Sequence, residues 1–281
     1  MSHDLKCRVS GGIWTTLQKE VERSGHSLST VVEQALTSAL GLEHHSLFQV
    51  STSGALVKGV FKGCTQVGDL KTHGDFGLGT YESLDGELVM LEGHCYQASA
   101  EGLITEAEDS WLVPFATITR FNADKELNFT SIDSIQILEQ MIDAERPSDN
   151  IFVGMRLEGV FDRIELRAAC KALPGEDLVA ATSHQSEFGF DDVEGTLVGF
   201  WTPTFAKTLN VAGYHFHFVS ADRTRGGHLL NLKANQLSAA LHFETDFHLA
   251  IPETEEFLRA DLQGDPSKAL DIAEKVTGSN R

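Results

Sequence analysis

Apolar residues recur along this chain with two different spacings, and the change between them divides the chain near residue 45. Over residues 5–42, apolar side chains follow the three- and four-residue spacing of amphipathic helices. From residue 47 onward, short apolar segments alternate with polar positions and are interrupted by glycine, which is typical of strands and turns. We therefore expect a small unit over residues 1–44 and a large, strand-rich unit over residues 47–281.

The small unit is predicted to be a strand followed by two helices. Over residues 5–9, Lys6 and Arg8 alternate with less polar neighbours, which indicates a short strand with one basic face. A first helix should end near Gly25, and a second should cover residues 27–40. We expect Thr30 and Glu33 to form a capping box at the start of the second helix and Gly41 to cap its end.

A strand followed by two short helices resembles the ribbon-helix-helix family. Those proteins dimerise by pairing the strand with its twin, and the repressors among them read DNA with the outward residues of that strand. A unit of this size buries too little apolar surface alone, so pairing with a second copy is physically expected. DNA binding would depend on Lys6 and Arg8 alone and is the weaker expectation. A helical dimerisation or packing arm is the alternative.

The large unit is predicted to contain mainly strands. Residues 43–46, which include His44 and His45, are interpreted as a polar linker and not as ligands, since adjacent side chains of an extended chain point to opposite sides. Glu158 and Gly159 are expected to form a turn between two strands. Segment 55–61 is apolar but of undetermined type. The expected strands lie at 47–52, 87–91, 111–121, 151–169 (two strands), 195–202 and 237–251. The expected helices lie at 131–144 and 268–276.

Composition and charge exclude several classes of protein. The formal net charge of -19 argues against a phosphate-rich partner for most of the chain. No apolar run is long enough to span a membrane, and the first residues lack the apolar core of a signal peptide. The four cysteines have no CxxC spacing, which favours free thiols in a reducing cytoplasm. We therefore expect a cytoplasmic protein without a membrane partner.

Three histidines form the candidate metal site. His215 and His217 lie on a predicted strand, two residues apart, so both side chains should project from one face. The polar stretch 220–227 ends in a glycine pair and indicates a hairpin, which would return His228 to the same place. Three imidazoles suit zinc, whose catalytic sites commonly use three protein ligands. The alternative is a solvated sheet face with His228 in a turn.

Other charged residues carry weaker signals. The glycines of segment 73–80 match no nucleotide-binding motif. Glu87 alone is more typical of a solvated strand residue than of a catalytic one. Arg163, Glu165 and Arg167 share one face of a predicted strand, which usually indicates a charged outer face.

Six segments of the large unit form a combined pattern: 49–52, 73–80, 84–88, 195–200, 213–218 and 226–228. Taken together, these segments resemble the α-acetolactate decarboxylase family. The resemblance covers residues 47 to the C-terminus and leaves residues 1–46 outside the family pattern. It implies an α/β (α+β), two-part fold of mixed and antiparallel β-sheets with few helices, a single zinc ion and usually a dimer.

The resemblance also implies roles for individual residues. By position, the zinc ligands would be His215, His217 and His228. Thr80 and Glu87 match the active-site threonine and first glutamate of the family.

Two further positions follow from the resemblance. Arg167 matches the active-site arginine. The family takes its second glutamate from the C-terminal tail, where Glu274 is the best match and Asp271 is a near alternative. Whether either glutamate of the pair also binds the metal is left open.

The implied activity is that of a carboxy-lyase, which converts 2-acetolactate to acetoin and CO2. The electrons released with CO2 move onto the adjacent ketone, and a zinc ion would stabilise the resulting enediolate as a Lewis acid. An arginine would hold the substrate carboxylate, and a carboxylic acid would protonate the enediolate. Another metal-dependent decarboxylase or tautomerase, or a metabolite-sensing DNA-binding regulator, is the alternative function. A homodimer or a higher homo-oligomer is expected.

Overall fold

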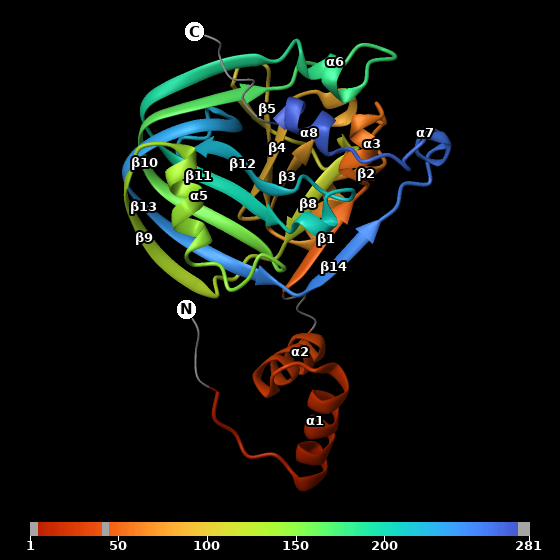
Figure 1. The fold of residues 1–281 in the computed structure, drawn as a ribbon, viewed down its shortest axis with the longest axis vertical. Helices are drawn as coiled ribbons and strands as arrows, with labels where there is room; N and C mark the ends of the chain where they lie inside the picture. The colour runs from red at the N-terminus through yellow and green to blue at the C-terminus, as the bar shows by residue number, and fades with distance from the viewer. Residues whose placement is uncertain (1–4, 41–44, 275–281) are drawn as a thin grey trace. The chain divides into compact units, whose positions relative to one another are not determined.

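The computed structural model describes residues 5–40 and 45–274 (Figure 1). Contacts within the chain divide it into two compact units, Met1–His44 and His45–Arg281. None of the described helices is both long and apolar enough to cross a membrane.

The small unit contains the two predicted helices, α1 (Gly11–Ser24) and α2 (Leu28–Leu40). Helix α1 ends at Gly25, whose positive φ of 73° is easy for a residue without a Cβ atom. The start of α2 differs from the prediction, because the hydroxyl of Ser27 accepts a hydrogen bond from the Thr30 backbone N–H. Ser27 therefore caps the helix, and the expected Thr30–Glu33 capping box is wrong.

The strand expected over residues 5–9 is not formed, and residues 5–10 have no regular secondary structure. A strand is stable only when its backbone groups are paired with another strand. The described part of this unit offers helices and no strand for such pairing. Gly41, the expected cap of α2, lies outside the described residues. The likeness to ribbon-helix-helix proteins stays a prediction.

The first sheet of the large unit has seven strands in the order β14-β1-β8-β3-β4-β5-β6. All neighbours are antiparallel except β1 and β14, which are parallel. A short ribbon pairs β2 (Thr65–Gln66) with β7 (Leu112–Val113). The sheet strands are β1 (Ser46–Val50), β3 (Phe76–Thr80), β4 (Glu87–Leu91), β5 (His94–Ala98), β6 (Ile104–Glu106), β8 (Phe115–Thr119) and β14 (Asp246–Ala250).

The second sheet has five strands in the order β10-β11-β12-β13-β9. Strand β10 pairs with both β11 and β13, so this sheet curls and closes on itself (Figure 1). Its strands are β9 (Lys125–Ile132), β10 (Phe152–Ala168), β11 (Ser186–Thr202), β12 (Gly213–Ser220) and β13 (Gly226–Glu244). The predicted fold class, mixed and antiparallel sheets with few helices, is confirmed.

Short helices surround the two sheets. Helix α5 packs against β9 and β13, and α8 lies against α3 and α6. The helices are α3 (Ser53–Val57), α4 (Val67–His73), α5 (Ile135–Asp143), α6 (Leu178–Thr182), α7 (Glu255–Arg259) and α8 (Ser267–Glu274), with 3-10 turns η1 (Glu82–Leu84) and η2 (Thr204–Ala206).

The two sheets pack face to face through a shared apolar core. Leu78 and Val89 of the first sheet meet Val198, Phe200 and Val219 of the second in one buried cluster. Inward-facing side chains of two sheets interdigitate in this way in sandwich folds. The packing brings β12 against β4 and β11 against β3, which positions the candidate site between the sheets.

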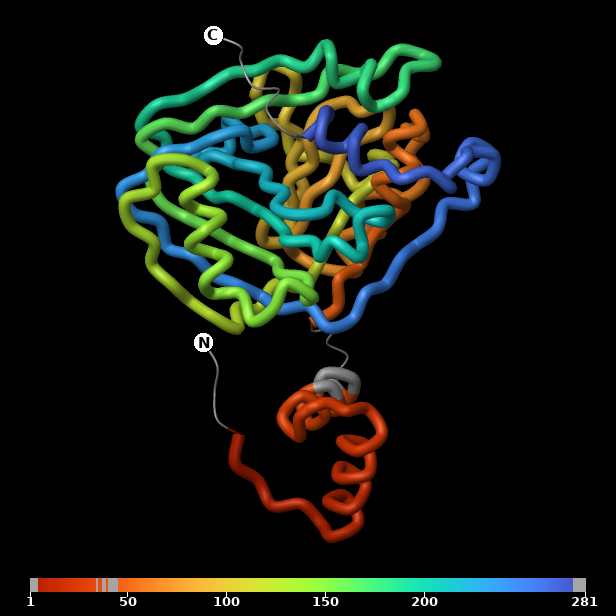
Figure 2. Tube along the Cα trace, in the orientation of Figure 1, coloured from red at the N-terminus to blue at the C-terminus, as the bar shows by residue number. Residues whose placement is uncertain are grey.

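Two predicted strand boundaries are wrong. Glu158 and Gly159 form no turn, because Gly159 pairs with Gly195 on one side and Leu237 on the other inside the continuous strand β10. The expected strand 237–251 is divided instead near Thr245, where the chain passes from β13 in the second sheet to β14 in the first (Figure 2).

The helix expected over residues 131–144 begins later than predicted. Ser134 caps α5 by accepting a hydrogen bond from the Ile137 N–H, and β9 occupies the residues before it. Strand β9 was not predicted, because its alternating pattern is carried mainly by charged and polar residues. The last helix, predicted over 268–276, is confirmed as α8 up to the end of the described residues.

Candidate active site

A row of three residues on neighbouring strands forms the base of the site. His217 of β12 lies directly opposite His228 of β13, and His228 lies directly opposite Arg167 of β10. Residues opposite one another in a sheet project from the same face. His215 stands two residues before His217 and shares that face. The hairpin predicted from the sequence therefore brings the three histidines together.

A β-bulge in β13 decides which residue stands beside Arg167. The register passes from Glu165 opposite Asn231 to Leu166 opposite Leu229, so Leu230 is the extra residue. An extra residue reverses the facing of the side chains that follow it. The bulge therefore turns His228 toward the site and places it opposite Arg167.

The three imidazoles are close enough to bind one ion. Their ring centroids are 4.9, 5.0 and 5.4 Å apart, and one ring nitrogen from each lies within 4.8 Å of the others. Nε2 of His215 is 3.2 Å from Nε2 of His217. Ligands of a tetrahedral zinc ion with bonds of about 2.1 Å are about 3.4 Å apart. All three side chains are buried.

The surroundings favour the neutral, ligating form of each imidazole. Nδ1 of His217 lies 2.8 Å from the backbone oxygen of Leu88, so it donates its proton there and leaves the Nε2 lone pair directed at the cluster. Burial lowers the pKa of His217 to about 4. Burial also lowers the pKa of His215 and of His228 well below the ordinary value.

Glu87 enters the site from the first sheet, at the start of β4. Its Oε2 is 3.5 Å from Nε2 of His217, and its Oε1 accepts a hydrogen bond of 3.1 Å from the Ala169 N–H. Burial raises the pKa of Glu87, and the nearby charge of Arg167 opposes that shift. Glu87 is not a solvated strand residue, since its side chain is only 12% exposed.

Thr80 lies directly opposite Glu87 in the ladder between β3 and β4. The side chain of Thr80 is buried, and its hydroxyl donates a hydrogen bond of 2.9 Å to the Gly86 oxygen. Both residues line the same small cavity as His215 and His217. The two sheets therefore contribute opposite walls of one site.

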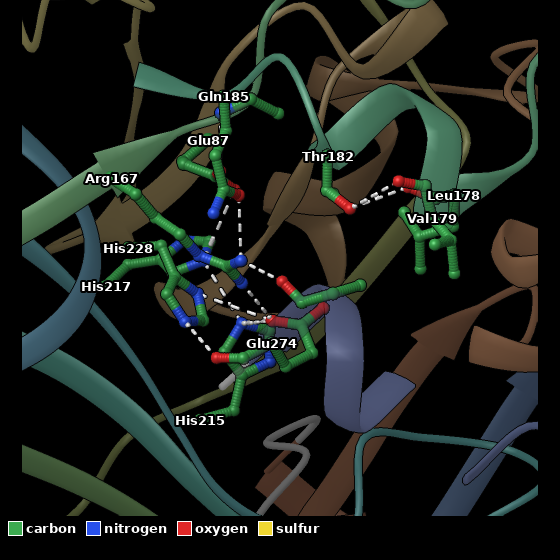
Figure 3. A network of polar contacts seen from close by, with 12 residues as sticks. Glu87, Arg167, Leu178, Val179, Thr182, Gln185, His215, His217, His228 and Glu274 are labelled. Carbon is green, nitrogen blue, oxygen red and sulfur yellow. Dashed lines mark hydrogen bonds and ion pairs between the residues drawn. The ribbon is translucent and has the colours of Figure 1, made fainter. Parts of the chain in front are cut away.

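Arg167 is buried, whereas Arg163 and Glu165 on the same face of β10 are exposed. Helix α8 accounts for the difference, because it covers the end of the strand that carries Arg167 (Figure 3). Arg163 instead pairs with Asp191 at the surface. The charged outer face inferred from the sequence is thus correct for Arg163 and Glu165 and wrong for Arg167.

Helix α8 contributes Glu274 to the centre of the site. Oε2 of Glu274 is 2.8 Å from Nη2 of Arg167, 3.6 Å from Nδ1 of His228 and 3.9 Å from Nε2 of His215. Burial raises the pKa of Glu274, and Arg167 opposes that shift. Asp271, the alternative tail residue, is exposed and lies one helical turn away. The structure therefore brings Glu274 to the histidines and leaves Asp271 outside their cluster.

Among the described residues, the guanidinium of Arg167 donates hydrogen bonds to three partners. Besides Glu274, Nη1 donates to Oε1 of Gln185 at 2.8 Å and to the backbone oxygen of Ala273. Gln185 was not identified from the sequence, and its position just before β11 offered no signal for it. The backbone N–H of Ala169, which binds Glu87, is equally invisible in the sequence.

Two cavities meet at α8. The smaller, about 50 Å³, is bounded by Thr80, Glu87 and Arg167 and has room for little more than water. The larger, about 570 Å³, extends toward α5 and is lined by His228 among others. Leu270 and Glu274 line both cavities, so side chains of α8 separate the small polar site from the larger space.

The sequence profile of the "Alpha-acetolactate decarboxylase" family matches residues 47–264. The chain is 39% identical over 230 residues to the alpha-acetolactate decarboxylase of Methanosarcina mazei, covering 82% of this chain and 80% of that protein. It is 40% identical over 228 residues to that of Raoultella terrigena, covering 79% and 87% respectively.

A solved structure agrees with these sequence matches. The crystal structure of alpha-acetolactate decarboxylase from Bacillus subtilis strain 168 superposes with a TM-score of 0.79 at 31% identity. It covers 82% of this chain and 99% of the other. The family profile begins after the small unit and ends before α8, so it includes neither the two N-terminal helices nor Glu274.

Proposed function

The chain belongs to the alpha-acetolactate decarboxylase family and is an acetolactate decarboxylase, and from this premise we propose that it works with a zinc ion. The ion would be held by His215, His217 and His228. The observation that carries this proposal is the meeting of three buried, neutral imidazoles on one sheet face. The reaction is the conversion of 2-acetolactate to acetoin and CO2.

The residues present fit a zinc ion. Nε2 of His215 and Nε2 of His217 face each other at 3.2 Å, a distance that requires a proton or a cation between the two lone pairs. The Nε2–H of a neutral His215 or a cation can fill this position, and because burial lowers both pKa values the rings stay neutral and able to bind a cation. When bound, zinc would supply Lewis-acid polarisation of the substrate oxygens.

Arg167 is proposed to hold the carboxylate of the substrate. A guanidinium presents a planar fork that matches a carboxylate at two points. In the present arrangement the carboxylate of Glu274 occupies part of that fork. Substrate would therefore replace Glu274 on Arg167, and Glu274 would turn toward the reacting carbon atoms.

Glu87 and Glu274 are proposed to handle the proton. Loss of CO2 leaves an electron pair that moves onto the neighbouring ketone, and the resulting enediolate must gain a proton at carbon to give acetoin. A carboxyl whose pKa is raised by burial is available in its protonated form. Burial has this effect on both glutamates, which approach the histidines from opposite sides. Thr80 would position the substrate beside Glu87.

The small unit is proposed to pair with a second copy in a homodimer or higher homo-oligomer. Ile13 and Trp14 are about half exposed on α1, and Leu36 is exposed on α2. An apolar surface of this kind is stabilised by contact with another protein surface. DNA binding by Lys6 and Arg8 is the weaker proposal. We place the protein in the cytoplasm, in keeping with its four free cysteines.

Removal and return of the metal tests the catalytic proposal. Dialysis against a chelator should abolish acetoin formation from racemic acetolactate, and stoichiometric Zn²⁺ should restore it. Mg²⁺, which prefers oxygen ligands, should not. Full acetoin formation by protein shown to be free of zinc would overturn the proposed role of the ion while leaving the decarboxylase assignment in place.

A further inference from the structure

A second cluster of metal-ligating residues lies apart from the catalytic histidines. It gathers three segments: His45 just before β1, Asp124 just before β9, and His242 near the end of β13. One donor atom from each lies within 4.8 Å of the other two. The linker role predicted for His45 from the sequence is therefore wrong, since its ring is packed into the large unit.

The spacing of the donor atoms suits a tetrahedral ion. Oδ2 of Asp124 is 3.3 Å from Nδ1 of His242 and 3.7 Å from Nδ1 of His45. Tetrahedral zinc places its ligand atoms about 3.4 Å apart. The two imidazole rings are stacked with centroids 4.9 Å apart. Two imidazoles and one carboxylate form a donor set typical of divalent first-row transition metals.

Hydrogen bonds hold the three residues in place. Nδ1 of His45 lies 2.6 Å from the Phe243 oxygen, and the Phe243 N–H donates to Oδ2 of Asp124 at 2.7 Å. His242 also contacts the backbone of Asn122. The backbone of Phe243 in β13 thus orients both His45 and Asp124.

Glu244 is a buried polar residue beside this cluster. It is only 2% exposed, and its carboxylate lies beside the side chains of Thr119 and His242. Oε1 of Glu244 lies 3.6 Å from Nε2 of His242, on the opposite edge of the ring from Asp124. Metal-bound histidines commonly have a carboxylate in this position. A buried carboxylate is stabilised by a paired imidazole or by a nearby positive charge.

We propose that His45, Asp124 and His242 form a second, structural site for a divalent transition metal such as zinc, with Glu244 orienting His242 from behind. The site would fasten the first residue of the large unit to the junction of its two sheets. The backbone oxygen of His45 already accepts hydrogen bonds from the N–H groups of Thr245 and Asp246, where β13 gives way to β14.

Metal stoichiometry of the full chain tests this site. The metal-free protein is titrated with Zn²⁺, and bound metal per chain is measured after gel filtration. Wild type should bind two equivalents. His217→Ala should bind one, held by the second cluster, and His45→Gln should also bind one while retaining acetoin formation. The double variant should bind none. Co²⁺ in the His217→Ala protein should give the visible absorption of a tetrahedral site.

Control variants test whether the second equivalent of metal is bound by these three residues. His248→Gln, an exposed histidine on β14, should still bind two equivalents. Asp124→Asn provides a second test should His242 variants fail to fold. A single equivalent in wild type, lost completely in His217→Ala, would refute the second site and identify the cluster as an ionised network without metal. A second equivalent that survives both His45→Gln and Asp124→Asn would refute these ligands.

Discussion

Arg167 and Glu274 form an ion pair of 2.8 Å between Nη2 and Oε2, although 107 positions separate them in the chain. Arg167 belongs to the sheet that carries the histidines, whereas Glu274 belongs to the last described helix. Their contact holds α8 beside the inner cavity, whose volume is about 50 Å³. We expect the substrate carboxylate to displace Glu274 from Arg167 when it binds.

The fork of Arg167 should be essential for holding the substrate. Arg167→Lys keeps the positive charge but loses the two-point contact. Loss of a charge-assisted hydrogen bond of about 1.5–3 kcal/mol should lower kcat/KM about tenfold to a hundredfold. The measurement is the initial rate of acetoin formation, with metal content checked in parallel. Arg163→Lys, on the exposed part of the same strand, should behave as wild type. Equal rates for both variants would place substrate binding elsewhere.

The carboxyl of Glu274 should matter, and that of Asp271 should not. Glu274→Gln keeps the shape of the side chain but removes the ionisable group beside Arg167 and the histidines. We expect kcat to fall about a hundredfold or more if Glu274 is the proton donor. Asp271→Asn, one turn earlier on α8, should retain activity. The reverse order of effects would transfer the tail role to Asp271.

Glu87 should be required for turnover more than for metal binding. Its pKa is raised by burial, and the contact of Oε1 with the Ala169 N–H holds it in place. Glu87→Gln should lower kcat by about a hundredfold to ten-thousandfold, the range for loss of a general acid. Zinc retention, measured on the same sample, separates this effect from loss of the ion. Glu106→Gln, exposed on β6, is the control. A near-normal kcat for Glu87→Gln would remove it from proton transfer.

His217 should be needed for the catalytic ion. It is fully buried within the site, and its Nδ1 is fixed by the Leu88 oxygen. His217→Ala should lose one equivalent of zinc and all measurable acetoin formation, because two imidazoles hold zinc poorly. His94→Ala, an exposed histidine on β5, should change neither quantity. Undiminished zinc binding by His217→Ala, measured in a chain that also carries His45→Gln, would exclude His217 as a ligand.

Local sequence patterns predicted the histidine hairpin well, because strand alternation and turn composition are short-range properties. His215 and His217 needed only the period of two, and the glycine pair indicated the turn before His228. The facing of His228 also depends on the bulge at Leu230, which two adjacent leucines do not reveal. The resemblance to the family implies His228 as a ligand without reference to this bulge.

Residues whose roles depend on distant segments could not be predicted in the same way. Glu87 and Arg167 resemble exposed strand residues until packing of the sheets and α8 buries them. His45 looked like a linker residue, since its neighbours Asp124 and His242 are far away in the sequence. The strand expected over residues 5–9 lacks a partner in the described part of a single chain.

The small unit should control assembly and not catalysis. Deletion of residues 1–40 leaves His45 and every proposed catalytic residue in place, so kcat should stay within about twofold of wild type. The mass by light scattering should fall, because the exposed side chains of Ile13 and Trp14 would no longer bring copies together.

A surface variant separates pairing through the helix from a general effect of deletion. Trp14→Glu introduces a charge on the exposed apolar face of α1 and should reproduce the smaller mass, whereas Lys19→Ala, on the same helix, should not. Unchanged mass in both the deletion and Trp14→Glu would refute pairing through this unit.

DNA binding predicts a different result: a salt-sensitive gel shift with duplex DNA that is lost when Lys6 and Arg8 are both changed to alanine. Because the chain carries a net charge of -19, we expect no such shift at physiological salt.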